Sequence, residues 1–189
     1  MNNELLKARI TEAYLETVDI NGYKFSRHRM QTKNLDSIDV LISVFEDIYI
    51  GDCISTDQWV LTCLSPKVKP MEVLIRIDKF ERCDAENFEM SEYLNSRVTG
   101  LLCTSSKCVL KSVGVDRVPF YNATLKVKNS FNESFDLYIL AFAKQAKILS
   151  TIKGGSLIDC IVTVKRRKSG EGWEFPISNI TVKSEVETK

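Results

Sequence analysis

The residues best suited to binding chemistry form a basic run that leads into a tryptophan near the end of the chain. Arg166-Arg167-Lys168 is followed by the turn signal Ser169-Gly170-Glu171-Gly172 and then by Trp173. Cations of this kind can neutralise phosphates, and an exposed aromatic ring can stack on a base. The same pattern also fits a solvated turn whose tryptophan covers the end of a core, and composition alone does not choose between the two.

Strand alternation adds outward-facing residues to this basic run. Leu125 and Val127 are expected to point inward, which turns the neighbouring lysines outward, and the next run presents a tyrosine opposite an apolar face. The predicted nucleic-acid contacts of the second half are Lys126, Lys128, Lys165, Arg166, Arg167 and Lys168 as phosphate-binding cations, with Tyr138 and Trp173 as stacking rings and Phe131 as a further stacking candidate.

The first half offers one comparable stripe. Arg27, Arg29, Gln31 and Lys33 fall on one side of a predicted strand, and its three basic members are predicted contacts as well. His28 falls on the opposite, inward side and is interpreted as a structural residue. Trp59 could either stack on a base or fill the core, and the sequence leaves both readings open.

Catalytic and metal-binding patterns are missing from the sequence. It contains no G-x-S-x-G, Walker loop, H-E-x-x-H or C-x-x-C motif, which predicts a non-catalytic protein without a metal or other cofactor. Reduced thiols are expected, since the cysteines are scattered and no export signal precedes them. The cysteines are Cys53, Cys63, Cys83, Cys103, Cys108 and Cys160.

Charge and hydropathy bound the class of protein. The 189 residues are 44% apolar and 27% charged, and no apolar run reaches the roughly 18–20 residues needed to span a bilayer. The N-terminus has no signal peptide, so a soluble cytoplasmic protein without membrane contact is expected. Residues 1–90 carry a net charge of −5 and residues 91–189 a net charge of +6, which makes the second half the candidate for a polyanion.

Short runs of β-branched and aromatic residues alternate with polar residues along most of the chain and predict strands. In the first half they are Arg9–Val18, Lys24–Thr32, Ile38–Phe45, Cys53–Leu64 and Glu72–Phe80. In the second half they are Arg97–Cys103, Val109–Val113, Ala123–Lys128, Phe135–Phe142, Leu157–Arg167 and Trp173–Val182. A helix is expected over Lys144–Ile152, where apolar residues recur every three positions before Gly154-Gly155.

The two halves look like a diverged repeat. Ser37–Phe45 and Ser134–Phe142 share a serine, an aspartate, an isoleucine and a final phenylalanine in register. Two copies of such a unit predict a mainly β protein with a short helix, built from two tandem barrels of about five strands each. The expected boundaries are 1–84 for an acidic barrel, 85–93 for a linker that could also form a short helix, and 94–189 for a basic barrel.

The stretch Phe135–Val182 resembles the oligonucleotide-binding (OB) barrel of bacterial and phage single-stranded DNA-binding proteins. Phe142, Lys144 and Ala146 are spaced as in that family's F-G-K-x-A-E segment, and a strand, a polar hairpin tip and a last strand follow. Primosomal replication proteins of the same superfamily fit almost as well. The resemblance implies two tandem OB folds, sequence-tolerant binding of single-stranded DNA or, as a second possibility, RNA, and assembly as a homodimer.

The chain departs from that family at three places. Ala143 stands where the motif has glycine, Asp136 stands where an aromatic residue is often found, and residues 184–189 are not the family's glycine-rich acidic tail. Because that tail recruits partners, the sequence favours an accessory role in replication or recombination, or a phage or mobile-element protein. The competing interpretation is a protein-interaction module that binds no nucleic acid and uses its acidic half against a basic partner.

Overall fold

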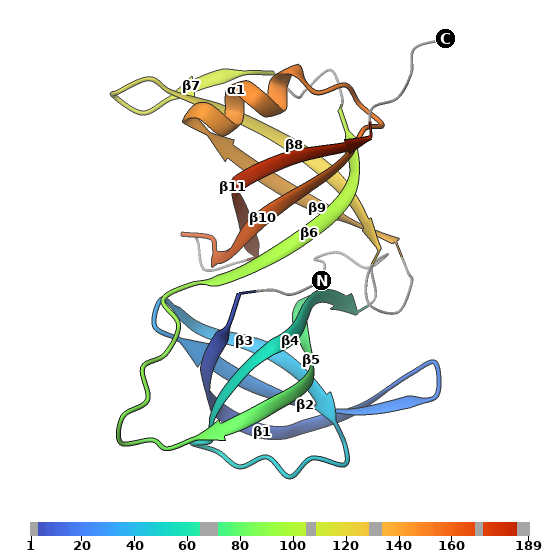
Figure 1. The fold of residues 1–189 in the computed structure, drawn as a ribbon, viewed down its shortest axis with the longest axis vertical. Helices are drawn as coiled ribbons and strands as arrows, with labels where there is room; N and C mark the ends of the chain where they lie inside the picture. Colours follow the sequence, from blue (N-terminus) through green and yellow to red (C-terminus); the bar gives the residue numbers. More distant parts are fainter. Residues whose placement is uncertain (1–3, 65–71, 105–108, 129–133, 169–171, 185–189) are drawn as a thin grey trace. The chain divides into compact units, whose positions relative to one another are not determined.

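The computed structural model describes residues 4–64, 72–104, 109–128, 134–168 and 172–184 (Figure 1). Over these residues the protein is almost entirely β, as the alternating sequence predicts, and one short helix is present. The chain separates into two compact units, of which the first runs to Leu94 and the second begins at Asn95. Each unit is therefore described on its own.

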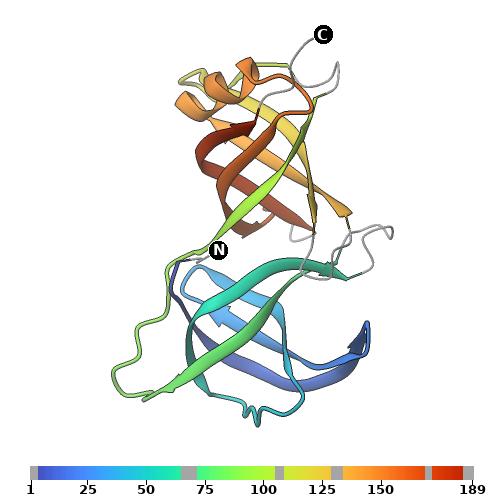
Figure 2. The ribbon, with the colours of Figure 1, turned by 45° about the vertical axis from the view of Figure 1, so that its right-hand side comes forward.

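The first unit is a closed barrel of five strands, seen as a ring in Figure 2. Its strands are β1 (Leu6–Ile20), β2 (Tyr23–Thr32), β3 (Leu35–Ser43), β4 (Cys53–Leu64) and β5 (Glu72–Cys83). They follow one another around the barrel in the order β1-β2-β3-β5-β4, and β4 pairs back onto β1. The β3–β5 pair is parallel and the other pairs are antiparallel.

The core of the first unit follows the period of two. Leu6, Ala8 and Ile10 of β1 are buried and alternate with partly exposed neighbours. Trp59 is only 2% exposed, and its Nε1 donates a hydrogen bond of 2.9 Å to the carbonyl of Glu4. The open question about this tryptophan is thereby answered, because it fills the core.

His28 is fully buried, which confirms its interpretation as a structural residue. Its Nδ1 accepts a 3.2 Å hydrogen bond from the backbone N–H of Tyr14, so Nε2 carries the proton and donates to Ser26 Oγ at 2.7 Å. The Ser26 hydroxyl in turn donates to the carbonyl of Ile42 at 3.3 Å. Tyr14 has a φ of 53° and lies where β1 slips out of regular register with β2.

The second unit repeats the strand order of the first. Its elements are β6 (Leu94–Cys103), β7 (Lys111–Val113), β8 (Val118–Lys128), β9 (Ser134–Phe142), α1 (Ala143–Thr151), β10 (Leu157–Arg166) and β11 (Trp173–Ser184). The sheet runs β6-β10-β11-β9-β8-β7, and pairing between β6 and β8 closes a ring of five strands. The prediction of two barrels with a short helix is confirmed, and β7 is an addition at the edge of β8.

Gly100 allows the second ring to close. It pairs with Val127 where β6 meets β8, and a Cβ atom at this position would lie 2.9 Å from the carbonyl oxygen of Lys126. Only a residue without a side chain fits so close an approach of two strands.

Residues 84–93, all of which the structure describes, contain no helix, so that alternative was wrong. Asp84 Oδ1 instead accepts a 3.2 Å hydrogen bond from the N–H of Glu86, a local turn that competes with helix formation. Farther along, Ser91 N–H donates to the carbonyl of Lys7 at 2.9 Å, and Ser91 Oγ accepts from the N–H of Lys7 at 2.8 Å. The end of this segment is thus held on the first unit.

Candidate nucleic-acid interface

The outer face of β8 and β9 presents the predicted lysines and tyrosine together. Lys126 and Lys128 are exposed, while the alternate residues Leu125 and Val127 are buried. In the antiparallel register Lys126 lies opposite Asp136, and Tyr138 lies opposite Thr124. The Tyr138 side chain is 53% exposed, so its ring is available for stacking. The two lysines form no ion pair within the described part of the chain.

The pairing of β10 with β11 fixes the basic run beside the tryptophan. Arg166 lies opposite Trp173, and its guanidinium carbon is 3.8 Å from the centre of the indole ring. Arg167 donates from Nε to the carbonyl of Trp173 at 3.2 Å. Lys165, Arg167 and Lys168 are exposed, whereas Ser169–Glu171 lie outside the described residues, as does Phe131.

Trp173 lies between the core and the surface of the second unit. Alternation puts it on the same side of β11 as the buried Phe175 and Ile177, yet it opens the strand and remains half-buried. One face of its ring is covered by Arg166. The indole therefore helps to close the end of the barrel, and its other role is to pack against the guanidinium of Arg166.

Parallel pairing links the basic hairpin to the β8–β9 face. Phe175 of β11 pairs with Ile139 of β9. The preceding residues, Glu174 and Tyr138, therefore occupy neighbouring positions on the outer side of the two strands. Glu174 is itself the cross-strand partner of Lys165. The register thus brings the base of the hairpin beside the exposed tyrosine.

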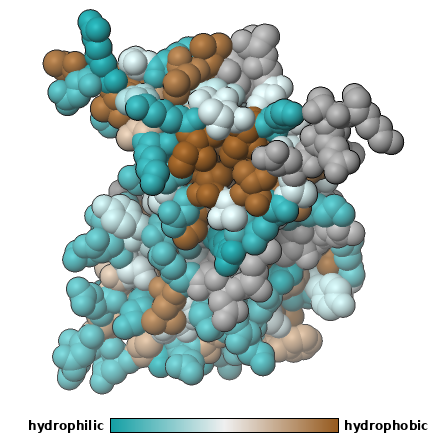
Figure 3. Space-filling view, turned by 45° about the horizontal axis from the view of Figure 1, so that its top comes forward, coloured by the Kyte–Doolittle hydropathy of each residue, from teal (hydrophilic) through white to brown (hydrophobic). Residues whose placement is uncertain are grey.

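Phe142 is a further exposed aromatic residue on this face that the sequence reasoning did not include among the stacking candidates. It is 41% exposed, and its ring centre is 5.2 Å from that of Phe120. Strand alternation indicates this exposure, because Phe142 is four residues after Tyr138 and therefore lies on the same face of β9. Apolar side chains are visible at the surface in Figure 3, and the large exposed ones of the second unit include Leu101, Val109, Leu110, Val115 and Phe142.

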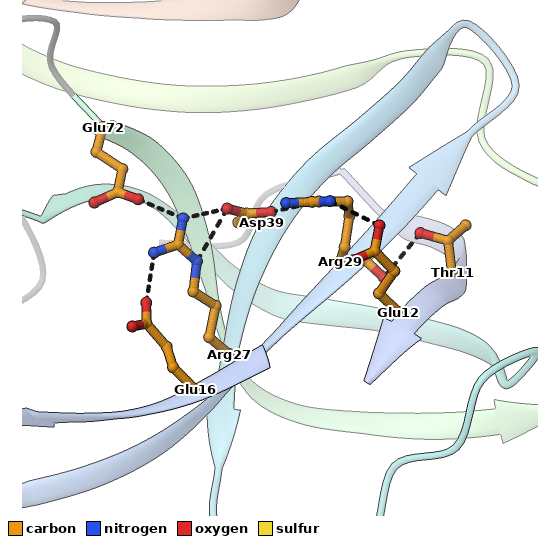
Figure 4. Close-up of polar contacts among 7 residues, drawn as sticks. All are labelled: Thr11, Glu12, Glu16, Arg27, Arg29, Asp39 and Glu72. Atoms are coloured by element: carbon orange, nitrogen blue, oxygen red, sulfur yellow. Dashed lines mark hydrogen bonds and ion pairs between the residues drawn. The ribbon is translucent and has the colours of Figure 1, made fainter. Parts of the chain in front are cut away.

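The basic stripe of the first unit is occupied by its own carboxylates (Figure 4). Arg27 forms ion pairs with Glu16, at 2.6 Å, and with Asp39 and Glu72. Its side chain is only 16% exposed.

Arg29 shares the same central carboxylate. It pairs with Glu12 at 2.7 Å and with Asp39 at 2.9 Å. Lys33, the third predicted contact of this stripe, is exposed and lies 3.8 Å from Glu92. Each of the three cations therefore has a carboxylate neighbour within its own unit.

The ion pairs shift the pKa values of Arg27 and Asp39. Burial by itself would lower the pKa of Arg27, but hydrogen bonds to Asp39, Glu16 and Glu72 outweigh it, so the pKa lies above the ordinary value. Burial would raise the pKa of Asp39, and the hydrogen bonds from Arg27 and Arg29 outweigh that effect, so its pKa is lowered. The aspartate is a carboxylate and both arginines are cations.

Equivalent positions in the two units are offset by two residues on the second strand. Arg29 lies opposite Asp39, and Lys126 lies opposite Asp136, so these two cations correspond. Aligning the turns instead, as the sequence suggested, pairs Gln31 with Lys126. Each cation lies ten positions before its aspartate, so one constant offset relates both strands of the two units, and the turn-based alignment is two residues out. A shift of two leaves every side chain on its predicted face.

The first unit also contains a groove that the sequence did not predict. It has a volume of about 630 Å³ and lies where β2 begins and β3 ends, next to the Asn21-Gly22 turn. Tyr23 and Phe45 line it and are highly exposed. Arg76 and Asp78 line it from β5 and form an ion pair with each other at 2.9 Å.

A polar cluster in the second unit surrounds the buried carboxylate of Asp159. Asp159 accepts hydrogen bonds from Arg97 Nε at 2.8 Å and from Thr99 Oγ1 at 2.9 Å, which satisfies this buried carboxylate. Among the residues that the structure describes, no group of three His, Cys, Asp or Glu side chains is placed to hold a metal ion. None of the described helical residues forms a helix long and apolar enough to span a membrane.

The sequence matches no protein-family model and no curated protein. Among solved structures, the single-stranded DNA-binding protein from Thermus aquaticus superposes with a TM-score of 0.66 at 10% identity, over 98% of this chain and 94% of that one. A deletion mutant of the same protein gives 0.63, over 98% and 95%. PriB from Ralstonia solanacearum covers 47% of this chain with 20% identity and a TM-score of 0.41. The Thermus aquaticus matches show that this chain has a tandem OB fold.

Proposed function

We propose that this chain binds single-stranded nucleic acid, with DNA as the expected strand, on the outer face of β8 and β9 and along the base of the β10–β11 hairpin. The observation that carries the proposal is the exposed ring of Tyr138 beside the exposed cations Lys126 and Lys128, which form no ion pair with any residue that the structure describes. In five-stranded barrels of this kind the second and third strands and the adjoining loops are the usual place for oligonucleotides.

The chemistry of this face favours sequence-tolerant binding. Lysine and arginine side chains contact phosphates, which carry no base information, and a stacked ring accepts any base. Arg166 and Arg167 extend the positive surface beside Trp173, where a second base could stack against the covered indole and its guanidinium. Duplex DNA hides its base faces, so we expect it to bind more weakly.

The second unit is expected to supply most of the affinity. It belongs to the half of the chain with net charge +6, and its candidate cations are exposed. Arg27 and Arg29 of the first unit must leave Asp39, Glu12 and Glu16 before they can meet a phosphate. Phosphate neutralisation dominates affinity for single strands, so the first unit starts at a disadvantage.

The fold likeness to a single-stranded DNA-binding protein supports a non-enzymatic role. We propose a cytoplasmic accessory protein of replication or recombination, or of a phage or mobile element, acting as a homodimer and contacting other proteins of that process. Light scattering at micromolar concentration should return twice the chain mass, and a monomer mass would contradict the dimer.

The decisive experiment is a salt titration of binding to labelled dT oligomers, with a duplex of equal length as the control. The proposal expects the logarithm of affinity to fall with that of salt concentration at roughly −0.7 per phosphate contact. A protein-interaction module would bind neither oligomer at any salt concentration. Equal or tighter binding of the duplex would refute the stacking mode.

A further inference from the structure

Two cysteines face each other across neighbouring strands of the first unit. β4 begins at Cys53, β5 ends at Cys83, and the antiparallel register pairs these two residues directly. The next pairs, Ile54 with Arg82 and Ser55 with Glu81, continue that register without a shift. Directly opposed residues of an antiparallel pair project to the same side of the sheet, so both thiols lie on one face.

The spacing of such a pair suits a covalent bridge. Directly opposed Cα atoms in antiparallel strands are about 4.5–5.5 Å apart. Disulfides join Cα atoms that are roughly 4.4–6.8 Å apart. Within the described residues no other cysteine has this relation, because Cys63 pairs with Val73, Cys103 with Thr124 and Cys160 with Ile180.

The two thiols differ in access to solvent. Cys53 is 3% exposed and its Sγ donates weakly to the carbonyl of Gly51 at 3.7 Å, whereas Cys83 is only half-buried. A small oxidant can therefore reach Cys83 first, and Cys53 is placed to complete the reaction from the opposite strand.

We infer that Cys53 and Cys83 are a modification site that a small-molecule disulfide converts into a cross-strand bridge of the first barrel. The Cys83 thiolate attacks the small disulfide, forms a mixed disulfide and releases one small thiolate. The Cys53 thiolate then attacks the Cys83 sulfur and releases the second. The small disulfide accepts two electrons, and the two small thiolates take up the two protons that the cysteines lose.

The bridge would act at a defined place in the unit. It would tie the start of β4 to the end of β5, immediately before residues 84–93 leave the barrel. Closing the segment between the two cysteines removes conformations from the unfolded chain, which raises the stability of the folded unit. The sequence predicts reduced thiols for this chain, and the register adds which pair closes when an oxidant is supplied.

The test uses the full chain treated with oxidised glutathione, alkylated and digested without reduction. We expect the peptide containing Cys83 to be linked to the peptide containing Cys53, and the intact chain to lose two hydrogen atoms. Cys53 and Cys63 share one tryptic peptide, so the matched variant Cys63→Ser must retain the link. Cys53→Ser must lose it and retain glutathione on Cys83. The oxidised wild type should unfold several degrees higher than the reduced protein, with no such shift in Cys83→Ser.

Three outcomes would overturn the inference. Wild-type Cys83 could keep glutathione as a stable mixed disulfide, the link could join a different pair of cysteines, or neither thiol could react. None of these results bears on nucleic-acid binding, which the dT titration tests separately.

Discussion

Replacing Arg166, Arg167 and Lys168 together with alanine should produce the largest change in binding of any three cations of this chain. All three side chains are exposed and lie where β10 ends or just beyond it. At roughly 0.7 counterions per phosphate contact, three lost contacts flatten the salt slope by about two units. Counterion release then predicts affinity about 100-fold weaker at 0.1 M salt, with the difference vanishing toward 1 M.

The matched perturbation is the triple replacement of Arg27, Arg29 and Lys33 with alanine. The two arginines already hold carboxylates, so only Lys33 is expected to count, at about 0.7 of a unit of slope and roughly 5-fold in affinity at 0.1 M salt. The thermal stability of this variant must be measured as a control, because Asp39 loses both of its arginine partners. Lys33→Ala alone avoids that loss and should give the same change in slope.

The assay is anisotropy of a labelled dT oligomer over a series of salt concentrations. A folded first-unit triple variant that loses more salt slope than the second-unit triple variant would show that the second unit does not supply most of the affinity. The arginines would then exchange their carboxylate partners for phosphates on binding, and the two barrels would bind as one unit.

Two further predictions follow from the aromatic and buried side chains. Tyr138→Ala and Trp173→Ala should each weaken dT binding by about 1–3 kcal/mol with no change of salt slope, since stacking releases no ions; a changed slope in the anisotropy titration would contradict this. Burial lowers the pKa of His28, so the folded state favours the neutral ring and stability should fall as pH drops below about 6.5, by at most ~1.4 kcal/mol per pH unit. Urea unfolding between pH 7.5 and 5.5 measures the effect, and His28→Gln should abolish it.

The chemistry behind the histidine prediction is local. Protonation of His28 Nδ1 would replace an acceptor by a donor that faces the N–H of Tyr14. Nε2 already donates to Ser26, so the ring has no second acceptor site to offer. Protonation therefore removes the hydrogen bond that holds the backbone of β1 at Tyr14, the residue with a positive φ. If stability is independent of pH over this range, the pKa of His28 is the same in the folded and unfolded states and the prediction is wrong.

Much of the second unit could be predicted because side-chain direction along a strand is local information. Leu125 and Val127 point inward and Lys126 and Lys128 outward whatever the strand pairs with. The helix was equally readable, since its apolar spacing and the following glycines lie within one short segment. The strand β7 was foreseen only approximately, because three exposed residues carry little periodic signal.

The ion pairs of the first unit could not be predicted in the same way. Arg27 reads as an outward cation on β2, which is correct for direction, but its partners come from three other strands. Glu16 reaches it because β1 departs from regular register between Ile10 and Glu16. Glu72 comes from β5, which lies two strands away around the barrel. Such partners depend on barrel closure and on a bulge, and the local alternation of residues predicts neither.

The two barrels therefore share a backbone plan and differ in what surrounds one cross-strand pair. Arg29 faces Asp39 in the first unit, and Lys126 faces Asp136 at the corresponding place in the second. In the first unit Asp39 binds a second arginine, and Glu12, Glu16 and Glu72 enclose both cations. In the second unit both members of the pair are exposed to solvent. A phosphate approaching the first face must displace carboxylates that are already hydrogen-bonded, whereas Lys126 and Lys128 on the second face form no ion pair among the described residues. This difference in desolvation and competition, more than the count of basic residues, is the physical reason to expect the strand on the second barrel.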